Sequence, residues 1–199
     1  MDEYYSEYDK VYCYGDTGVL KNKLGIIDAN QLMTAEREIT ALRMAEGMIN
    51  RVEGNFDFNH LKAIHYFLFR DIYEWAGQTR TINISKGSEF CRVEYIEEQA
   101  KLLFNKLKKE DYLRKYTDIN QVAERLAYYI SEINAIHPFR EGNGRAQRMF
   151  IEYLSYYNGY QLDFMKITSE EMLEASIQSF NIDYTMMEQL FKRAISSLK

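Results

Sequence analysis

Apolar residues recur every three or four positions through most of the chain, which is the period of amphipathic α-helices. This pattern predicts helices over residues 30–52, 59–75, 94–108, 119–136, 145–157, 169–180 and from 184 to the end. The stripe is most continuous in residues 119–136, where its members are Ile119, Val122, Leu126, Ile130 and Ile133. Two alanines in the same segment, Ala123 and Ala127, allow close packing, so we expect this helix to be central.

Residues 79–93 break the helical pattern. Within TINISKGSEFCRV, apolar and polar residues alternate on both sides of a Lys-Gly-Ser turn, which predicts a short β-hairpin. An isolated two-stranded hairpin is only marginally stable in water, so we expect it to lie against the helices as a flap. The predicted fold is an all-α single domain over residues 1–199 with one hairpin. Residues 1–18 hold several tyrosines without periodicity and are expected to form an irregular arm.

Composition narrows the class of protein. Of the 199 residues 46% are hydrophobic, which is enough for a sizeable core, and a single proline fits long helices. A net charge of −5 argues against broad binding to nucleic acid or to an anionic membrane, and no run of about 18 apolar residues indicates a membrane span. The acidic start is the reverse of a signal peptide. We therefore expect a cytoplasmic protein without nucleic-acid or membrane partners.

The three histidines and two cysteines are scattered along the chain. Two cysteines are too few for a disulfide framework, so free thiols are expected, and no zinc-type cluster of ligands occurs. His60 and His65 are five positions apart on a predicted helix and do not share a face well. Both are interpreted as packing or surface residues.

The segment HPFREGNGRAQR, residues 137–148, concentrates the candidate chemistry. A residue before proline is driven out of the helical region, so the preceding helix must end near Ile136 and the loop can fix the ring of His137. The glycines around Asn143 permit a tight turn into a new helix, whose first N–H groups form an anion site. Arg145 and Arg148 lie three apart on that helix, and arginine binds phosphate bidentately.

A carboxylate next to a phosphate site is explained if Mg²⁺ lies between them, because this ion binds one or two carboxylates together with phosphate oxygens. Glu141 is then the metal-binding residue. A histidine fixed beside bound phosphates can take a proton from an attacking hydroxyl as a general base. The segment therefore predicts Mg²⁺-dependent phosphoryl or nucleotidyl transfer to a hydroxyl, with His137 as the base.

The same residues also allow other interpretations. Glycine-rich loops commonly join helices, surface arginines are usually solvated, and a lone histidine is more often structural than catalytic. A non-catalytic module that binds a nucleotide or a partner therefore stays an alternative, and a helical nucleic-acid-binding protein is the weakest one because no marked basic stripe occurs outside the segment. A P-loop is excluded, since the chain contains no GxxxxGK[ST] sequence.

The segment HPFREGNGRAQR matches the HxFx[D/E]GNGRxxR signature of Fic-domain proteins at every defined position. The stretch HLKAIHYFLFRDIYEWAGQTR followed by ISKG resembles the helix that leads into the flap of this family, and VLKNKLGI resembles the start of many bacterial members. The resemblance covers residues 20–198. It implies a helical fold with a hairpin over the site, and AMP transfer from ATP to a Tyr, Thr or Ser hydroxyl of a target protein.

The resemblance also implies roles for single residues. His137 would be the general base, Phe139 the core anchor and Glu141 the Mg²⁺ ligand. Gly142, Asn143 and Gly144 would cradle phosphates, with Arg145 on the β-phosphate and Arg148 on the γ-phosphate. The flap would dock the target segment by strand addition, and its docking residues would be Ile84, Ser85, Lys86, Gly87 and Phe90. Relatives that act as kinases carry Lys at the second motif glycine, and Gly144 argues against that alternative.

Many Fic proteins are inhibited by a helix with the pattern [S/T]xxxE[G/N], whose glutamate pairs with the second motif arginine. This chain has no full match: Ile39 follows the stretch Thr34–Glu38, and Leu42 precedes the Glu46-Gly47 pair where a hydroxyl residue should stand. We therefore expect inhibition by a separate, small antitoxin-like protein that supplies a glutamate to Arg148, with residues 33–48 as part of its dock. The protein would then be the toxin of a toxin–antitoxin pair, acting in its own cell or delivered to another.

Overall fold

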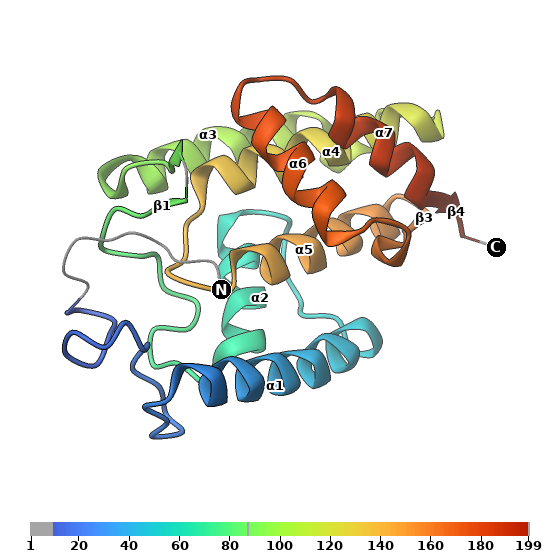
Figure 1. Ribbon diagram of the computed structural model, residues 1–199. Helices are drawn as coiled ribbons and strands as arrows, with labels where there is room; N and C mark the ends of the chain where they lie inside the picture. The colour runs from blue at the N-terminus through green and yellow to red at the C-terminus, as the bar shows by residue number, and fades with distance from the viewer. Residues whose placement is uncertain (1–9, 87, 199) are drawn as a thin grey trace.

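The computed structural model describes residues 10–86 and 88–198, so residues 1–9 of the predicted arm and Gly87 of the predicted flap lie outside the described residues. Within the described part of the chain there are seven α-helices and two small antiparallel ribbons (Figure 1). The all-α prediction is confirmed. None of the described helices has the combined length and apolar character that a bilayer crossing requires.

The helices are α1 (Ala29–Ile49), α2 (Phe58–Phe69), α3 (Ile96–Lys109), α4 (Ile119–Ile136), α5 (Asn143–Tyr157), α6 (Ser169–Phe180) and α7 (Thr185–Ala194). The strands are β1 (Ser85–Lys86), β2 (Ser88–Glu89), β3 (Tyr160–Leu162) and β4 (Ile195–Ser197). Short 3₁₀ turns cover Val93–Tyr95, Asp111–Leu113 and Phe164–Lys166.

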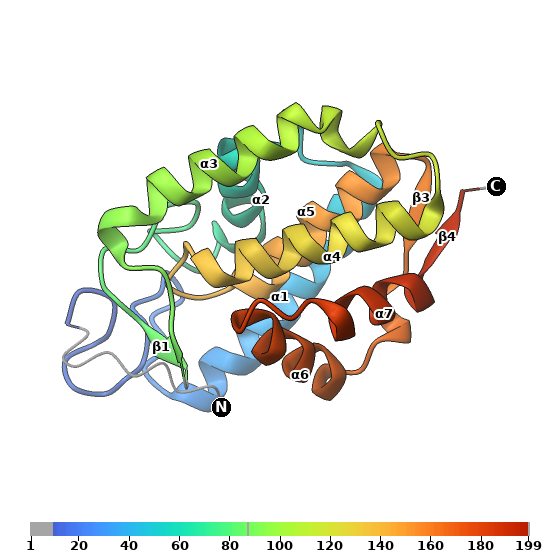
Figure 2. The same cartoon turned by 90° about the horizontal axis from the view of Figure 1, so that it is seen from above.

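Helix α4 is the central element, as its continuous apolar stripe predicts. It packs against α3, α5, α6 and α7, and Figure 2 shows it between α3 and the α6–α7 pair. Ala123 and Ala127 are fully buried, which lets these neighbours approach closely. The Asp118 side chain accepts hydrogen bonds from the first backbone N–H groups of α4 and so fixes where the helix begins. Helix α5 packs on α4 and α2, and α1 covers α2.

Three predicted helix ends are wrong. Helix α1 ends at Ile49, not Val52. Helix α7 ends at Ala194, and β4 pairs antiparallel with β3, with Leu162 opposite Ile195. The Leu162 and Ile195 side chains are buried, while Ser196 and Ser197 are exposed, so the pairing buries the first residue of β4 and leaves the next two in solvent. Helix α2 ends at Phe69, not Trp75.

The first described residues form turns that pack on the base of the flap. Tyr12 is buried, its ring meets Trp75 edge to face at 5.6 Å, and its hydroxyl accepts a hydrogen bond from the Thr81 N–H at 3.0 Å. Cys13 and Leu20 form an isolated antiparallel bridge. The described part of the predicted arm is therefore irregular and packed against the helices.

The flap strands are shorter than the predicted hairpin over 79–93, since only Ser85–Lys86 and Ser88–Glu89 pair. The segment that carries them is held by the Arg80 side chain, which is 3% exposed. Its guanidinium donates to the Ile82 and Cys91 carbonyls on either side of the hairpin, and to the Ile136 and His137 carbonyls at the end of α4. Arg80 therefore ties the flap to the segment that holds the candidate chemistry.

Backbone contacts reinforce this attachment. The Arg80 N–H donates to the Pro138 carbonyl at 2.8 Å, and the Cys91 N–H donates to the Ala135 carbonyl at 3.1 Å. The expectation that helices support the hairpin is met, with a buried cation and backbone hydrogen bonds as the supporting contacts.

Replacing Arg80 with methionine keeps much of the side-chain volume and removes all of its donors. Because buried carbonyls then lose charge-assisted partners, we expect Arg80→Met to lower the free energy of unfolding by about 3 kcal/mol in urea denaturation. Arg92→Met is the control, since Arg92 is exposed and its ion pair with Glu94 is long at 4.0 Å. The free energy of unfolding of this variant should stay within about 0.5 kcal/mol of the wild-type value. An unchanged stability of Arg80→Met would contradict the assignment.

Candidate active site

His137 occupies the turn that ends α4. Its backbone is left-handed, with φ 47° and ψ 61°, which a non-glycine residue adopts at a cost of about 1 kcal/mol. Such strain is typical of functional positions. The Asn134 carbonyl lies 3.3 Å from Nδ1, and because a carbonyl can only accept, Nδ1 carries the proton and Nε2 keeps its lone pair. The Phe90 ring stacks on the imidazole at 3.8 Å.

The imidazole of His137 is neutral at physiological pH. Burial lowers its pKa to about 3, and the positive charges of Arg80 and Lys86 act in the same direction, against the hydrogen bond to Asn134. A neutral imidazole whose Nε2 carries no proton can accept one, which is the requirement for a general base.

The loop after His137 is held by its own side chains. Asn143 Oδ1 accepts from the Phe139 N–H at 2.9 Å, and Asn143 Nδ2 donates to the Phe139 carbonyl at 2.7 Å. Phe139 is 1% exposed and stacks on His65 at 3.9 Å. The Asn143 side chain is thus occupied inside the loop, so an anion site at this turn would be made by the first backbone N–H groups of α5 and not by the Asn143 amide.

His65 fixes the loop from the α2 side. Its Nδ1 accepts from the Gly77 N–H at 2.9 Å, so its Nε2 must carry the proton that it donates to the Glu141 carbonyl, also at 2.9 Å. The ring is fully buried, and burial lowers its pKa to about 3. The sequence interpretation of His65 as a packing residue captures its burial but misses this link to the motif.

Gly142 makes the tight turn into α5. Its φ is +81°, and a Cβ there would lie 2.2 Å from the Phe69 ring, so only glycine fits. The Gly142 N–H donates to Glu141 Oε1 at 2.9 Å. Burial, with the charge of Glu36, raises the pKa of the Glu141 carboxyl, while the Gly142 N–H and Arg145 oppose this shift.

The two motif arginines differ in their surroundings. Arg145 contacts Glu36 and Thr40 of α1, and its Nη2 lies 3.5 Å from Glu141 Oε1. Arg148 makes no hydrogen bond or ion pair with any residue that the structure describes. Burial and the charge of Arg145 lower the pKa of Arg148, with Glu152 opposing. The first arginine is therefore compensated by direct contacts, and the second is a half-buried charge that makes no ion pair with the described residues.

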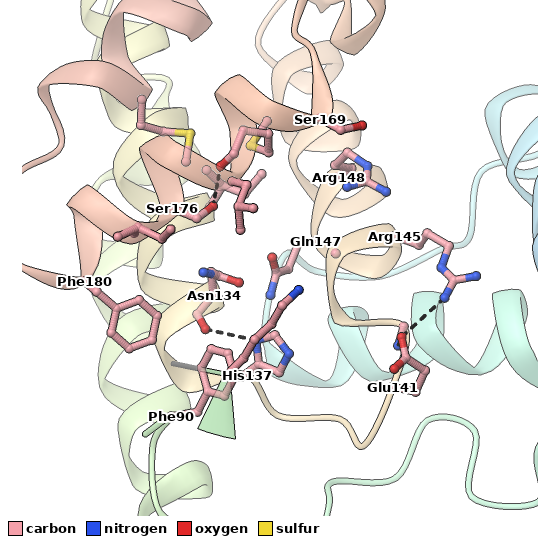
Figure 3. A pocket seen from close by; sticks show the side chains of 18 residues that line it. Phe90, Asn134, His137, Glu141, Arg145, Gln147, Arg148, Ser169, Ser176 and Phe180 are labelled. Atoms are coloured by element: carbon pink, nitrogen blue, oxygen red, sulfur yellow. Dashed lines mark hydrogen bonds and ion pairs between the residues drawn. The ribbon is translucent and has the colours of Figure 1, made fainter. Parts of the chain in front are cut away.

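These groups line one cavity of about 620 Å³ (Figure 3). Its polar end is made by His137, Glu141, Gly142, Gly144, Arg145 and Arg148, and Lys86 and Phe90 of the flap segment border it. The opposite wall comes largely from α6 and is formed by Ser169, Met172, Leu173, Ser176, Ile177 and Phe180. Figure 3 shows Gln147 facing the cavity between the two helices that flank the turn; its Nε2 is buried without a partner among the described residues.

The structure thus brings the predicted motif residues to one cavity, with Phe139 and Asn143 beneath it. Flap residue Ile84 is 2% exposed and lies outside the paired strands, and Phe90 covers His137. Sequence reasoning missed the contributions of Glu36, Arg80 and Gln147. No sequence signal marks Glu36, because the buried face of α1 consists of Leu32, Glu36, Thr40 and Gly47 and so holds only one large apolar residue.

Glu141 fits a Mg²⁺ ion as one ligand among several. No group of three His, Cys, Asp or Glu residues arranged to share a metal occurs in the described residues. A single carboxylate next to an anion site suits Mg²⁺, which takes one or two protein carboxylates and completes its shell with phosphate oxygens and water.

Comparison with known proteins agrees with this fold. Residues 55–155 match the Fic/DOC family. The chain is 40% identical to the probable protein adenylyltransferase y4lH of Sinorhizobium fredii, over 96% of this chain and 98% of the relative. It is 37% identical to the probable protein adenylyltransferase Fic of Salmonella typhimurium, over 100% of this chain and 98% of that one. The chain belongs to the Fic/DOC family.

Relatives of other lengths and solved structures extend the likeness. The protein adenylyltransferase VbhT of Bartonella schoenbuchensis is 40% identical over 93% of this chain but only 39% of its own length. The Fic domain of a VirB-translocated effector from Bartonella quintana, solved with ADP, superposes with a TM-score of 0.89 at 31% identity, over 95% of this chain and 96% of that one. BepC of Bartonella tribocorum, solved with AMPPNP, gives 0.88 at 30% identity, over 95% and 98%.

The neutral, buried histidines predict an acid-labile fold. Between pH 6.5 and 3 the imidazoles of His65 and His137 bind protons in the unfolded chain but stay neutral in the folded one. The free energy of unfolding is therefore highest above pH 6.5 and falls as the pH drops. We expect each imidazole to remove about 1 kcal/mol of unfolding free energy between pH 6.5 and 5.5, measured by urea denaturation. His137→Asn should show a shallower pH dependence, and a flat profile in wild type would contradict both pKa shifts.

Proposed function

We propose that the protein transfers AMP from ATP to a Tyr, Thr or Ser hydroxyl of a target protein. Relatives that match this chain over nearly their whole length are named probable protein adenylyltransferases, and this chain is an enzyme of that class by homology. The observation that carries the reaction is the neutral His137 imidazole, with its proton on Nδ1, at the edge of a cavity whose other polar groups suit polyphosphate.

In this proposal the phosphates of ATP bind at the start of α5. The backbone N–H groups of Asn143 and Gly144 favour an anion there, because the positive end of the helix dipole adds to them. The Gly142 N–H would join them once it is released from Glu141 Oε1. Arg145 would bind the β-phosphate and Arg148 the γ-phosphate. The nucleoside would occupy the remainder of the cavity, where Met172, Leu173 and Ile177 give an apolar wall.

The transfer step is a displacement at the α-phosphorus. His137 Nε2 takes the proton from the target hydroxyl, the oxygen forms a bond to the α-phosphorus, and the bond to the leaving pyrophosphate breaks. Arg145 and Arg148 stabilise the charge that builds up on the leaving group. Mg²⁺ held by Glu141 would add further charge neutralisation on the phosphates.

The flap would present the target. Strands β1 and β2 form a two-stranded ribbon beside the cavity, and an extended target segment can add to such an edge through backbone hydrogen bonds. Lys86 of β1 and Phe90 line the cavity, so a segment bound along Ser85 and Lys86 would bring its hydroxyl toward His137. Backbone pairing of this kind carries little side-chain specificity, so it does not select one target.

ATP labelled at the α- or the γ-phosphate tests the reaction. With Mg²⁺ and a lysate that supplies targets, we expect a protein band labelled from α-labelled ATP only, because AMP keeps the α-phosphate and loses the γ-phosphate. His137→Ala should abolish the label, and so should His137→Asn, which suits the left-handed backbone better and controls for misfolding. Label from γ-labelled ATP alone would identify a kinase. If the protein binds ATP but no protein in a lysate of the producing cells becomes labelled, a non-catalytic binding module is favoured.

We further propose control by a separate small protein that supplies a glutamate to Arg148. Arg148 also borders a second cavity of about 460 Å³, formed by α1, α5, β3 and the start of α6. Met44, Met48 and Met165 give this cavity an apolar wall, and Met165 is 93% exposed. A partner helix in this cavity could bury apolar side chains and pair a carboxylate with the uncompensated Arg148.

Two acidic residues, Glu152 and Asp163, line the second cavity, and burial together with the charge of Asp163 raises the pKa of Glu152 to about 7. A group of this kind is partly protonated at neutral pH and so repels a partner carboxylate less than a full charge would. The proposed site of action is the cytoplasm, where ATP and Mg²⁺ are present, in the producing cell or in a cell to which the protein is delivered.

A charge in the second cavity should separate inhibition from catalysis. We expect tagged wild-type protein, purified from the cells that produce it, to carry a small bound protein, and Met48→Glu to lose it because a partner glutamate and apolar side chains are repelled. AMP transfer by partner-free Met48→Glu should equal that of partner-free wild type. Leu102→Glu, an exposed position on α3, is the control. If wild type carries no partner and transfers AMP as fast as Met48→Glu when both are tested as purified from the cells, the proposed inhibition by a separate protein is wrong.

A further inference from the structure

Helix α1 contacts the first motif arginine although it lies outside residues 55–155, which match the Fic/DOC family. Glu36 Oε1 accepts from Arg145 Nη2 at 2.5 Å, and Thr40 Oγ1 accepts from Arg145 Nη1 at 3.1 Å. Glu36 and Thr40 are one turn apart on the same face, and both are buried. The arginine is therefore held from a helix that lies more than 100 positions away in sequence.

The Glu36 carboxylate is itself fixed in place. The Tyr73 hydroxyl donates to Glu36 Oε2, so both carboxylate oxygens have partners. Tyr73 is 1% exposed, and burial raises the pKa of its hydroxyl, which keeps it protonated as a donor. A buried carboxylate with two partners has one geometry, whereas an exposed ion pair has many.

Two carboxylates thus compete for one guanidinium. Arg145 Nη2 lies 2.5 Å from Glu36 and 3.5 Å from Glu141, so the stronger contact is with Glu36. The guanidinium also lies over the Phe69 ring, 4.8 Å from its centroid, which limits its movement. If the charge of Glu36 were removed, the nearest anion for Arg145 would be Glu141, the residue that suits a divalent cation.

The position of Arg145 leaves donors for a ligand. Arginine has five N–H groups, and the contacts to Glu36, Thr40 and Glu141 use three. The Nε–H and one Nη1–H remain, and Arg145 lines the main cavity.

We infer that Glu36 is a positioning residue: it takes the shorter of the two carboxylate contacts of Arg145 and leaves Glu141 the longer one, so that the arginine can bind nucleotide phosphate while Glu141 stays available to a divalent cation. The inference rests on the proposed function. It predicts that the loss of the Glu36 charge weakens ATP binding mainly when Mg²⁺ is present, because only then does Glu141 need to be free of the arginine.

Calorimetric titration with ATP tests this directly, once with Mg²⁺ and once with EDTA, and needs neither target nor turnover. For wild type the ratio of the two affinities measures the contribution of the cation. We expect Glu36→Gln to lower that ratio about tenfold, since an Arg145–Glu141 pair would have to break before the cation binds. Glu38→Gln is the control, because Glu38 is exposed on the same helix, and its ratio should equal that of wild type.

Each outcome has a distinct meaning. If Glu36→Gln loses the same factor of ATP affinity with Mg²⁺ and with EDTA, the ratio is unchanged. Glu36 then only supports the fold, and the inference is overturned. Failure of wild type to bind ATP under either condition would instead overturn the proposed function. Tyr73→Phe serves if Glu36→Gln does not fold: it frees Glu36 Oε2 without altering any charge, and we expect a smaller fall in the same ratio.

Discussion

The turn between α4 and α5 buries backbone polar groups that neither helix can satisfy, and the site depends on how these groups find partners. Buried N–H and C=O groups are almost always paired, because leaving them without partners is costly. Here the partners are side chains from three directions. The Asn143 side chain, within the loop, bonds the N–H and the carbonyl of Phe139. His65 of α2 donates to the Glu141 carbonyl. Arg80 of the flap segment donates to the carbonyls of Ile136 and His137.

The same three side chains connect the loop to the surrounding elements. Because Arg80 bonds both sides of the hairpin as well as the end of α4, the flap and His137 share one anchor. Because His65 is also bonded to Gly77, the segment after α2 is tied to the same loop. The geometry of the site is therefore a property of α2, α4, α5 and the flap segment together, and strain at the left-handed His137 is borne by all of them.

The electrostatics of the site follow from burial and pairing. The two buried histidines at the turn are neutral, Arg145 is balanced by α1, and Arg148 is left without a counterion among the described residues. Positive charge is thus uncompensated at the junction of two cavities, where a phosphate from one side and a carboxylate from the other would compete for it.

The sequence was informative where a local pattern decides the structure. The apolar stripe of residues 119–136 predicted α4 with its observed bounds, and Pro138 predicted where it ends. The β3–β4 ribbon escaped prediction because it joins two segments more than 30 residues apart, and each strand is too short to show its own period. The contacts of Glu36 and Arg80 were also hidden, since charged residues are usually solvated and only the tertiary structure shows these two buried.

The placement of an acidic partner on α1 has an evolutionary consequence. The twelve-residue signature would remain intact in a descendant that had lost only the carboxylate at position 36, because none of its own letters would change. Such a descendant would be counted among active members by any survey of signatures, while its first arginine would rest on the neighbouring carboxylate. Loss of activity can therefore begin in a helix that the signature does not include. The residue at position 36 of α1 then distinguishes an active descendant from an inactive one.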